Sequence, residues 1–499
     1  MLSDNIGRTP EGVLTIAGQE VTRLAAEYGT PLYLMDEQRI RSNCRMYLKA
    51  FRENFPEGSL PLYASKAASF KQIYRIMAEE GMGVDVVSSG ELYTALAAGF
   101  PAERIHFHGN CKTDADIAYG VASGIGCFIA DNREELLALE KTAAGAGVTQ
   151  AILLRVTPGI DPHTYEAVST GKVDSKFGAA VETGQAMELV KLALAQPHLK
   201  LLGLHCHVGS QVFGEDVYQR TIDIMAAFLA EIRDETGAVL EELNLGGGYG
   251  VRYTEEDETI DIPARLREVA LHLRRETEKH GLPMPRFLME PGRSIVADAG
   301  MTLYTVGSIK RIPGYKQYAA VDGGMTDNPR YALYQSRYTV YHGSKTGPTE
   351  RFDVVGRCCE SGDIIQPHVE LPADTCRGDI LAVCTTGAYN YSMASNYNRL
   401  PRPPLQHLGR HGGGGPQPLG RLRLMLLTRV GEILLIIGQH VLQLPGRELS
   451  RQRVPQARQE FRLIHAAPPF RPAKVPQSAP DSAPTPSGTL PAGPAGVMA

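Results

Sequence analysis

The chain has 499 residues, of which 43% are hydrophobic and 21% are charged, a composition that excludes collagen-like, coiled-coil and wholly disordered chains. The formal net charge of −4 provides no overall basic field to hold nucleic acid. The eight cysteines include no Cys-X-X-Cys pair, which argues against a disulfide framework or a structural zinc site and favours a reducing, cytoplasmic compartment.

Two segments bear on targeting. Residues 1–18 lack a cationic start followed by an apolar core, so no signal peptide is expected. Residues 420–445 are apolar, but Arg423, Arg429 and Glu432 interrupt them, and the uninterrupted run is shorter than the ~18 residues that a membrane span needs. The sequence therefore predicts no transmembrane helix.

Short β-rich runs alternate with amphipathic helical stretches over the first three hundred residues. Strands are expected at 61–65, 83–87, 104–107, 126–130, 151–156, 201–206, 241–245 and 286–290. Helices are expected at 69–80, 89–98, 132–145, 182–195, 215–236 and 262–280, among others. Eight strands in alternation with helices predict an α/β fold of the (β/α)₈ TIM-barrel type, although a doubly wound sheet produces the same alternation.

The pattern changes after residue 297, where short, β-branched, glycine-punctuated runs predict an all-β domain over 298–404. The strand-like residues 1–34 are expected to join this domain, which leaves 35–297 for the barrel.

The segment 405–499 differs in composition from everything before it. It contains ten Arg, one Lys, four acidic residues and no Tyr, and its proline-rich end from residue 466 is expected to be disordered. We interpret the abrupt change as a shift of reading frame near residue 404 that removes the last strands of the β domain. A genuine appended extension is the alternative.

Reactive and phosphate-suited residues follow the ends of the predicted strands, and in a barrel these ends meet at one rim. They are Lys66, Asp85, His108, Arg155 and the segments 205–210, 246–250 and 290–294. The glycine run 246–250 can bring its amides close to an anion, and a helix beginning soon after would add its dipole. With Gly292 and Arg293 after the next strand, a phosphate site is predicted; the glycine run alone would equally suit a tight turn.

Lys66 follows an apolar strand in the sequence YASKA. It is either a solvated lysine at a strand end or an amine whose pKa is lowered by burial, able to form a Schiff base. A cofactor with both an aldehyde and a phosphate is pyridoxal phosphate, which also requires an acidic partner for its ring nitrogen. Glu290 is positioned for that role, and His205 or His207 can stack on the ring.

The two histidines admit other roles. Strand alternation would place both on one face and make a metal pair, but no third ligand stands out, so no metal is expected. For His205, we favour a core histidine with its hydrogen bonds satisfied.

The motifs YASKA, DVVSSGEL, GLHCHVGSQ, LNLGGGYG, EPGRS, VDGGMTDNPRYALY, CESGD and GAYNYSMASNYN together resemble the fold-type III pyridoxal-phosphate decarboxylases. Residues 159–178 resemble the branch that acts on meso-2,6-diaminopimelate rather than ornithine or arginine. The resemblance extends, in order, from about residue 10 to about residue 404.

The resemblance implies the cofactor contacts. Lys66 would hold pyridoxal phosphate covalently, His207 would stack on its ring, and Glu290 would pair with the ring nitrogen. The phosphate would be bound by Ser210, Gly247, Gly248, Gly292 and Arg293, with Tyr389 closing over it. Asp85 and Arg155 would support the cofactor from the barrel floor.

The implied activity is that of a carboxy-lyase converting meso-diaminopimelate to L-lysine and CO₂, the last step of lysine biosynthesis. Cys359 would protonate Cα, with Lys66 as the alternative acid; a buried structural thiol is the other role open to Cys359. The substrate contacts would be Arg293, Arg330, Tyr334, Glu360 and Tyr389. Cys359 and Glu360 would reach across a homodimer interface into the partner's site.

Other functions remain open from the sequence. They are a broad lysine/ornithine decarboxylase, a racemase of related fold, and a binding homologue or an enzyme inactivated by its altered C-terminus. Arg330 favours diaminopimelate, because ornithine and lysine have no distal carboxylate to pair with an arginine.

Overall fold

The structure, a computed structural model, describes residues 1–160, 174–214 and 216–409. The predictions for the tail beyond 409, for the apolar segment 420–445 and for most of the stretch 159–178 lie outside these residues. Within the described ranges, no helix is both long and apolar enough to cross a membrane.

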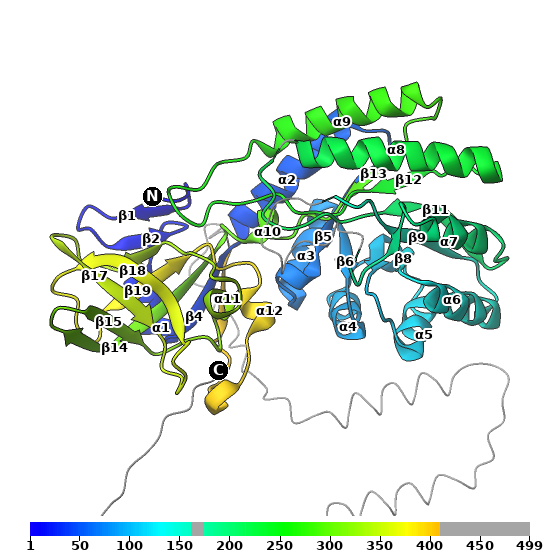
Figure 1. Ribbon diagram of the computed structural model, residues 1–499. Helices are drawn as coiled ribbons and strands as arrows, with labels where there is room; N and C mark the ends of the chain where they lie inside the picture. The colour runs from blue at the N-terminus through cyan, green and yellow to red at the C-terminus, as the bar shows by residue number, and fades with distance from the viewer. Residues whose placement is uncertain (161–173, 215, 410–499) are drawn as a thin grey trace, which may run out of the picture. The chain divides into compact units, whose positions relative to one another are not determined.

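A closed barrel of eight parallel strands forms the first part of the fold, with helices around it (Figure 1). The strands are β5 (Leu60–Ala64), β6 (Gly83–Val86), β7 (Ile105–Phe107), β8 (Cys127–Ala130), β9 (Gln150–Thr157), β11 (Leu199–His205), β12 (Glu242–Asn244) and β13 (Arg286–Met289). The barrel closes because β13 pairs with β5 while β8 pairs with β9. The predicted TIM-type barrel is therefore confirmed, and the doubly wound sheet is excluded.

Helices follow the barrel strands along the chain, and a polar side chain caps the start of some of them. They are α3 (Lys71–Glu80), α4 (Ser89–Ala97), α5 (Asp114–Ala122), α6 (Arg133–Ala146), α7 (Gln185–Leu194), α8 (Asp216–Thr236), α9 (Ile262–Lys279) and the short α10 (Arg293–Val296). At α4, the Ser88 hydroxyl accepts from the Glu91 amide at 3.2 Å, and at α6 the Asn132 side chain accepts from the Glu135 amide at 3.0 Å. One polar residue thus satisfies an amide that the helix itself leaves unpaired.

Among the helices around the barrel, α5 and α2 (Glu37–Asn54) do not correspond to any of the ranges named from the sequence. The nine residues of α5 are mostly small, so their apolar face is weak, and a capping box between Thr113 and Asp116 marks the start instead. The stretch of α2 is dominated by charged and polar residues, but Ile40, Cys44, Tyr47 and Phe51 recur at helical spacing and are all buried.

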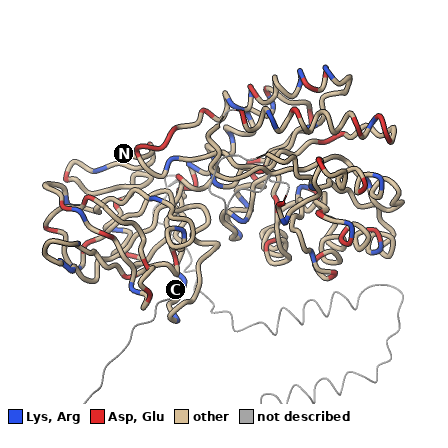
Figure 2. Tube along the Cα trace, viewed as in Figure 1, with Lys and Arg blue, Asp and Glu red and all other residues tan. Residues whose placement is uncertain are grey.

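Charges of both signs alternate along the outer helices α8 and α9 (Figure 2). Several form pairs one turn apart, such as Lys279 with Glu276 at 2.7 Å and Arg220 with Asp216 at 3.1 Å. These faces are mixed, solvated surfaces rather than a stripe of one sign.

The second part is a β domain, built around one sheet in the order β16-β19-β14-β15-β17-β18. Its strands are β14 (Gly300–Ile312), β15 (Lys316–Val321), β16 (Val340–His342), β17 (Thr349–Val355), β18 (Ile364–Pro372) and β19 (Ile380–Cys384). Two short helices, α11 (Arg330–Tyr334) and α12 (Asn390–Met393), lie in its connections. The prediction of an all-β domain after the barrel is confirmed.

The N-terminal strands join the β domain, as predicted. β4 (Leu32–Asp36) pairs antiparallel with β14, and the small sheet of β1 (Ile6–Arg8), β2 (Leu14–Ile16) and β3 (Gln19–Glu20) precedes helix α1 (Val21–Tyr28). Apolar side chains from the N-terminal segment and from the β domain form one core, including Leu14, Leu34, Met301 and Leu303. Burial of this shared apolar surface holds the N-terminal segment against the domain.

Two strands of the β domain were not anticipated. β18 contains Pro367, which is unusual inside a strand, and it is accommodated by irregular pairing with β17 and by a positive φ of 58° at His368. β20 (Leu405–Leu408) lies just beyond the expected boundary at residue 404 and pairs in parallel with β4.

Asp327 provides a stability prediction for this domain. It is buried and accepts hydrogen bonds from the Tyr304 hydroxyl and the Gly324 amide, and burial raises the pKa of its carboxyl to about 6. Because the folded state binds this proton more tightly than the unfolded chain, the carboxyl stabilises the fold below about pH 4, and that contribution is lost as the pH rises to 6.

Asp327→Asn should therefore flatten the pH dependence of the free energy of unfolding between pH 4 and 6, by at most about 3 kcal/mol. Urea unfolding of both proteins, followed by circular dichroism at several pH values, measures this slope. Equal slopes for the two proteins would contradict the assignment.

Candidate active site

The carboxyl ends of β5, β6 and β13 bring Lys66, Asp85 and Glu290 to one barrel mouth. Lys66 lies in the single turn Ser65–Ala67 that follows β5, and its side chain is exposed. Asp85 is buried within β6, and neither of its carboxylate oxygens has a hydrogen-bond partner among the described residues. Burial raises the pKa of Asp85 well above its usual value, and the Glu290 charge adds to this effect.

The pKa of Lys66 differs from the expectation. The surrounding protein limits hydration and works to lower the pKa, but the charges of Asp85 and Glu290 oppose this effect, and the pKa is raised on balance. The prediction of an amine with a lowered pKa was therefore wrong for the protein without a bound group. The reason is that the sequence does not show how close the Asp85 and Glu290 carboxylates lie to the amine.

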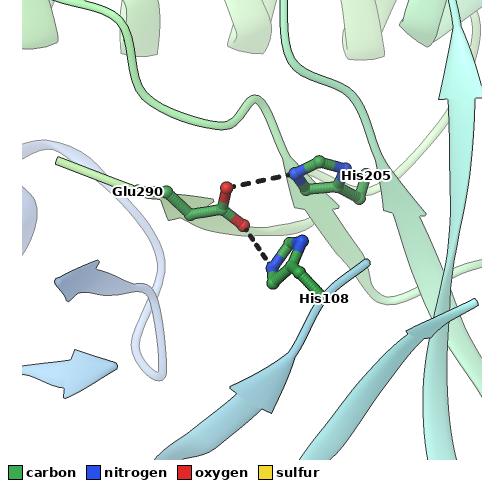
Figure 3. A group of neighbouring side chains, drawn as sticks. All are labelled: His108, His205 and Glu290. Carbon is green, nitrogen blue, oxygen red and sulfur yellow. Dashed lines mark hydrogen bonds and ion pairs between the residues drawn. The ribbon is translucent and has the colours of Figure 1, made fainter. Parts of the chain in front are cut away.

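Glu290, just past β13, is the centre of a buried hydrogen-bond network (Figure 3). Its Oε1 accepts from Asn244 Nδ2 at 2.8 Å and lies 2.9 Å from His108 Nε2, while Oε2 lies 3.2 Å from His205 Nε2. Burial alone would raise the pKa of Glu290, but these neighbours lower it well below its usual value. The carboxylate is ionised, with a donor on each oxygen.

The histidines are not arranged as the metal hypothesis assumed. β11 ends at His205, so strand alternation does not continue to His207. His205 instead lies with His108 and Glu290, a grouping close enough to hold a metal ion, and His108 is thus the third candidate ligand that did not stand out in the sequence. His205 and Asn244 form hydrogen bonds with the Glu290 carboxylate, whereas His108 Nε2 lies close to it without a hydrogen bond among the described residues.

His207 lies over the glycine turn that follows β12. Its Nδ1 accepts from the Gly247 amide at 3.2 Å, and burial, together with the Lys66 charge, lowers its pKa well below the usual value. The ring is therefore neutral and carries its proton on Nε2.

The glycines of this turn are required by close packing. A Cβ on Gly247 would lie 2.1 Å from the Glu290 carbonyl oxygen, and one on Gly248 would lie 2.4 Å from the Gly209 carbonyl oxygen, with φ already at +120°. The expected helix after this run is missing: the next helix, α9, begins only at Ile262. It is the neighbouring turn, at Gly292, that leads directly into a short helix, α10.

Arg293 connects this turn to the β domain. Its Nη2 donates to Ser210 Oγ at 2.9 Å, and its Nη1 donates to the Tyr253 hydroxyl. Its guanidinium carbon also lies 4.7 Å from the centre of the Tyr389 ring. An arginine and a serine hydroxyl next to a glycine turn form a suitable anion site.

Arg330, the first residue of α11, is a second arginine near the Tyr389 ring. Its guanidinium carbon is 5.3 Å from the Tyr389 ring centre and 5.2 Å from that of Tyr334. It is buried, its Nη2 donates to Ser336 Oγ at 3.3 Å, and its Nε has no partner among the described residues. The structure thus brings together Arg293, Tyr389, Arg330 and Tyr334.

The remaining barrel residues are placed as follows. Arg155 is buried on β9 and stacks on Phe177, with its guanidinium carbon 4.2 Å from the ring centre, and burial lowers its pKa. Gly292 faces β5, where an added Cβ would lie 2.9 Å from that of Ala64.

Cys359 and Glu360 lie apart from this group. Both are exposed between β17 and β18 of the β domain, and the Cys359 amide donates to Asn398 Oδ1 at 2.7 Å. Within the described chain, neither side chain makes a hydrogen bond or ion pair with the barrel.

Three residues of the site were not assigned roles from the sequence. Asn244 and His108 contact Glu290, and the Tyr253 hydroxyl receives a hydrogen bond from Arg293. A buried polar residue at the end of a predicted barrel strand was the available signal for Asn244 and His108. Tyr253 gave no such signal, because it lies in the irregular connection after the glycine turn.

Comparison with known families identifies the family to which the barrel residues are similar. The family described as "Pyridoxal-dependent decarboxylase, pyridoxal binding domain" matches residues 38–297.

Curated relatives resemble both parts of the described chain. The diaminopimelate decarboxylase of Bacillus subtilis (strain 168) is 44% identical over 396 residues, which cover 79% of this chain and 90% of the relative. That of Staphylococcus aureus (strain COL) is 42% identical over 395 residues, covering 79% of this chain and 92% of the relative.

Solved structures that resemble this chain include diaminopimelate decarboxylases as well. The crystal structure of diaminopimelate decarboxylase from M. jannaschii in complex with L-lysine superposes with a TM-score of 0.75 and 34% identity, covering 82% of this chain and 94% of that one. The Helicobacter pylori enzyme with L-lysine gives 0.71 and 32%, covering 78% and 94%.

Proposed function

Because the chain belongs to the pyridoxal-dependent decarboxylases, we propose that it removes one carboxylate of meso-2,6-diaminopimelate as CO₂ and leaves L-lysine. The observation that carries the proposal is the arrangement of two arginines around Tyr389. Arg293 lies beside the barrel mouth, and Arg330 lies on the β-domain side. A substrate with an amino-acid group at each end needs such a second cationic group beyond the reacting one.

The residues of the mouth fit pyridoxal phosphate. Lys66 supplies an amine for the aldehyde, the ionised Glu290 suits a protonated ring nitrogen, and Asp85 offers a buried carboxylate without a hydrogen bond. The donors near the phosphate position are Ser210, Arg293 and the backbone amides near Gly248 and Gly292, and Gly247 allows the close approach while its own amide donates to His207. When bound, this cofactor supplies an electron sink for the negative charge left on Cα as CO₂ departs.

The other residues at the barrel mouth orient the cofactor and balance the charge on Lys66. His207 presents a neutral ring for stacking, and Asp85 balances the charge on the Lys66 ammonium. Arg155, stacked on Phe177, supports the floor of the site. Tyr389 covers the anion site, since its ring contacts Arg293 and its amide donates to the Ala67 carbonyl oxygen at 2.7 Å.

Substrate binding is assigned to the residues at the β-domain side of the mouth. Arg330 and Tyr334 pair with the distal carboxylate, and Arg293 and Tyr389 contact the substrate from the barrel side. A buried guanidinium such as that of Arg330 is costly to leave unpaired, so a substrate lacking the distal carboxylate binds poorly.

Cα is protonated by Cys359, and the distal amine pairs with Glu360. Both side chains are exposed, and neither makes a hydrogen bond or ion pair with the described residues of its own barrel. We therefore propose that they act in the partner's site of a homodimer. The cytoplasm is the proposed compartment, in keeping with eight free cysteines, of which Cys111, Cys359 and Cys376 are exposed.

The test is CO₂ release from meso-diaminopimelate, L-lysine and L-ornithine by the purified protein with pyridoxal phosphate. Only diaminopimelate should react. Arg330→Leu should lower kcat/KM for it roughly 10- to 100-fold, the effect of losing a charged hydrogen bond, with no gain for lysine. Comparable release from lysine by the unaltered protein would instead indicate a broad decarboxylase.

A further inference from the structure

We propose that Tyr253 is a positioning residue, whose hydroxyl accepts a hydrogen bond from Arg293 and holds its guanidinium in the orientation that an anion at the barrel mouth requires. The inference rests on the proposed function, because Arg293 has a cofactor phosphate and a substrate carboxylate to meet only if the chain binds both. Tyr253 itself touches neither group and acts through the arginine.

The guanidinium of Arg293 is held from two sides. Its Nη1 donates to the Tyr253 hydroxyl, and its Nη2 donates to Ser210 Oγ at 2.9 Å. Ser210 follows β11 and Tyr253 follows β12, so the two anchors come from connections after neighbouring strands of the barrel. A planar guanidinium with a single anchor can turn about that hydrogen bond, whereas two anchors fix the plane of the group.

The two anchors leave Nε of Arg293 unpaired. The side chain is buried, and Nε has no hydrogen-bond partner among the described residues. A buried N–H of a cation is costly to leave unpaired unless an anion accepts from it. Because Tyr253 and Ser210 fix the plane of the guanidinium, they also set the direction in which Nε meets that anion.

Tyr253 is itself fixed in place. Its amide donates to Asp257 Oδ2 at 2.8 Å, and its carbonyl oxygen accepts from the amide and the hydroxyl of Thr339 at 3.0 and 2.9 Å. Its ring packs edge to face with that of Tyr338 in the β domain, with the ring centres 5.3 Å apart and the ring planes at 89°. The phenol oxygen therefore has a fixed position, and a phenylalanine would keep the packing of the ring while removing the acceptor.

The test compares the unaltered protein with Tyr253→Phe. The dissociation constant of pyridoxal phosphate, titrated into the apo-protein by absorbance, should rise roughly 10-fold, the lower end of the effect of losing a charged hydrogen bond. KM for meso-diaminopimelate at saturating cofactor should rise by a similar factor with little change in kcat, as expected for a loss of binding alone. A purely structural role would instead lower the fraction of folded protein and leave both constants unchanged.

A double-mutant cycle with Arg293→Lys tests whether Tyr253 acts through the arginine. Lysine keeps the positive charge but replaces the planar fork of the guanidinium by a single nitrogen. Adding Tyr253→Phe to Arg293→Lys should therefore change the dissociation constant of pyridoxal phosphate by less than about 2-fold. Additive effects of the two substitutions would overturn the proposal.

Tyr341→Phe is the matched control. Tyr341 lies on β16 of the β domain, and its buried hydroxyl oxygen has no hydrogen-bond partner among the described residues, so both constants should stay at their wild-type values. A Tyr253→Phe protein that behaves like this control would overturn the proposal.

Failure of the proposed function would look different. If the unaltered protein binds pyridoxal phosphate but releases no CO₂ from diaminopimelate, the proposed function is refuted and the cofactor titrations still decide the role of Tyr253. If it binds no pyridoxal phosphate, both proposals are refuted.

A crystal structure of the unaltered holoenzyme covers the case in which Tyr253→Phe fails to fold. Arg293 Nη1 should lie within about 3.2 Å of the Tyr253 hydroxyl oxygen, the limit for a hydrogen bond between these groups. A guanidinium that has turned away from Tyr253 would overturn the proposal.

Discussion

Lys66→Ala should abolish the visible absorbance band that the protein acquires with pyridoxal phosphate and should lower CO₂ release at least about 10³-fold, as expected for removal of a group that acts in the chemical steps. Lys66 is the exposed amine at the mouth, and the carboxylates of Asp85 and Glu290 shift its pKa. Its loss removes the covalent attachment and leaves those charges without their cation. Absorbance spectra and CO₂ release, measured on the same preparation, check both effects.

The control is Lys71→Ala. Lys71 is also exposed and lies five residues further on, at the first position of α3, so its removal should leave both the band and the activity intact. A Lys66→Ala protein that retains the band would show that another amine holds the cofactor, and the assignment of Lys66 would fail.

The barrel was predictable because its signal is local. Strands buried on both faces contain continuous apolar runs, such as Ile152–Leu154 in β9, and the helices between them show periodic apolar positions. Elements whose signal is weak or interrupted were not recognised. α5 is short with a small apolar face, and β18 contains Pro367 and depends on pairing with β17, a contact between distant residues.

The site divides in the same way. Residues at strand ends, such as Lys66 and Glu290, were identified because the barrel topology fixes where those ends meet. The pKa of Lys66 and the proximity of His108 to Glu290 could not be predicted from the sequence. Both depend on distances between strands, which the sequence does not contain. The prediction that His205 and His207 form a metal pair was wrong for a related reason. β11 ends at His205, so the strand alternation that would place both side chains on one face ends there too.

Cys359→Ala should lower kcat roughly 10²- to 10⁴-fold, the usual effect of losing a general acid, with cofactor binding retained. Cys376→Ala is the matched control, since Cys376 is another exposed cysteine of the β domain. The position of Cys359, exposed and without a hydrogen bond or ion pair to the described part of its own barrel, implies that the acid acts in a neighbouring subunit.

Mixing two inactive proteins tests this sharing directly. In a dimer of one Lys66→Ala and one Cys359→Ala subunit, a shared site receives Lys66 from one chain and Cys359 from the other, so one of the two sites carries neither change. Random assembly makes half of the dimers mixed, and about a quarter of the wild-type activity should return. If each site used only its own chain, every site would lack one residue, and coexpression of the two proteins would restore nothing.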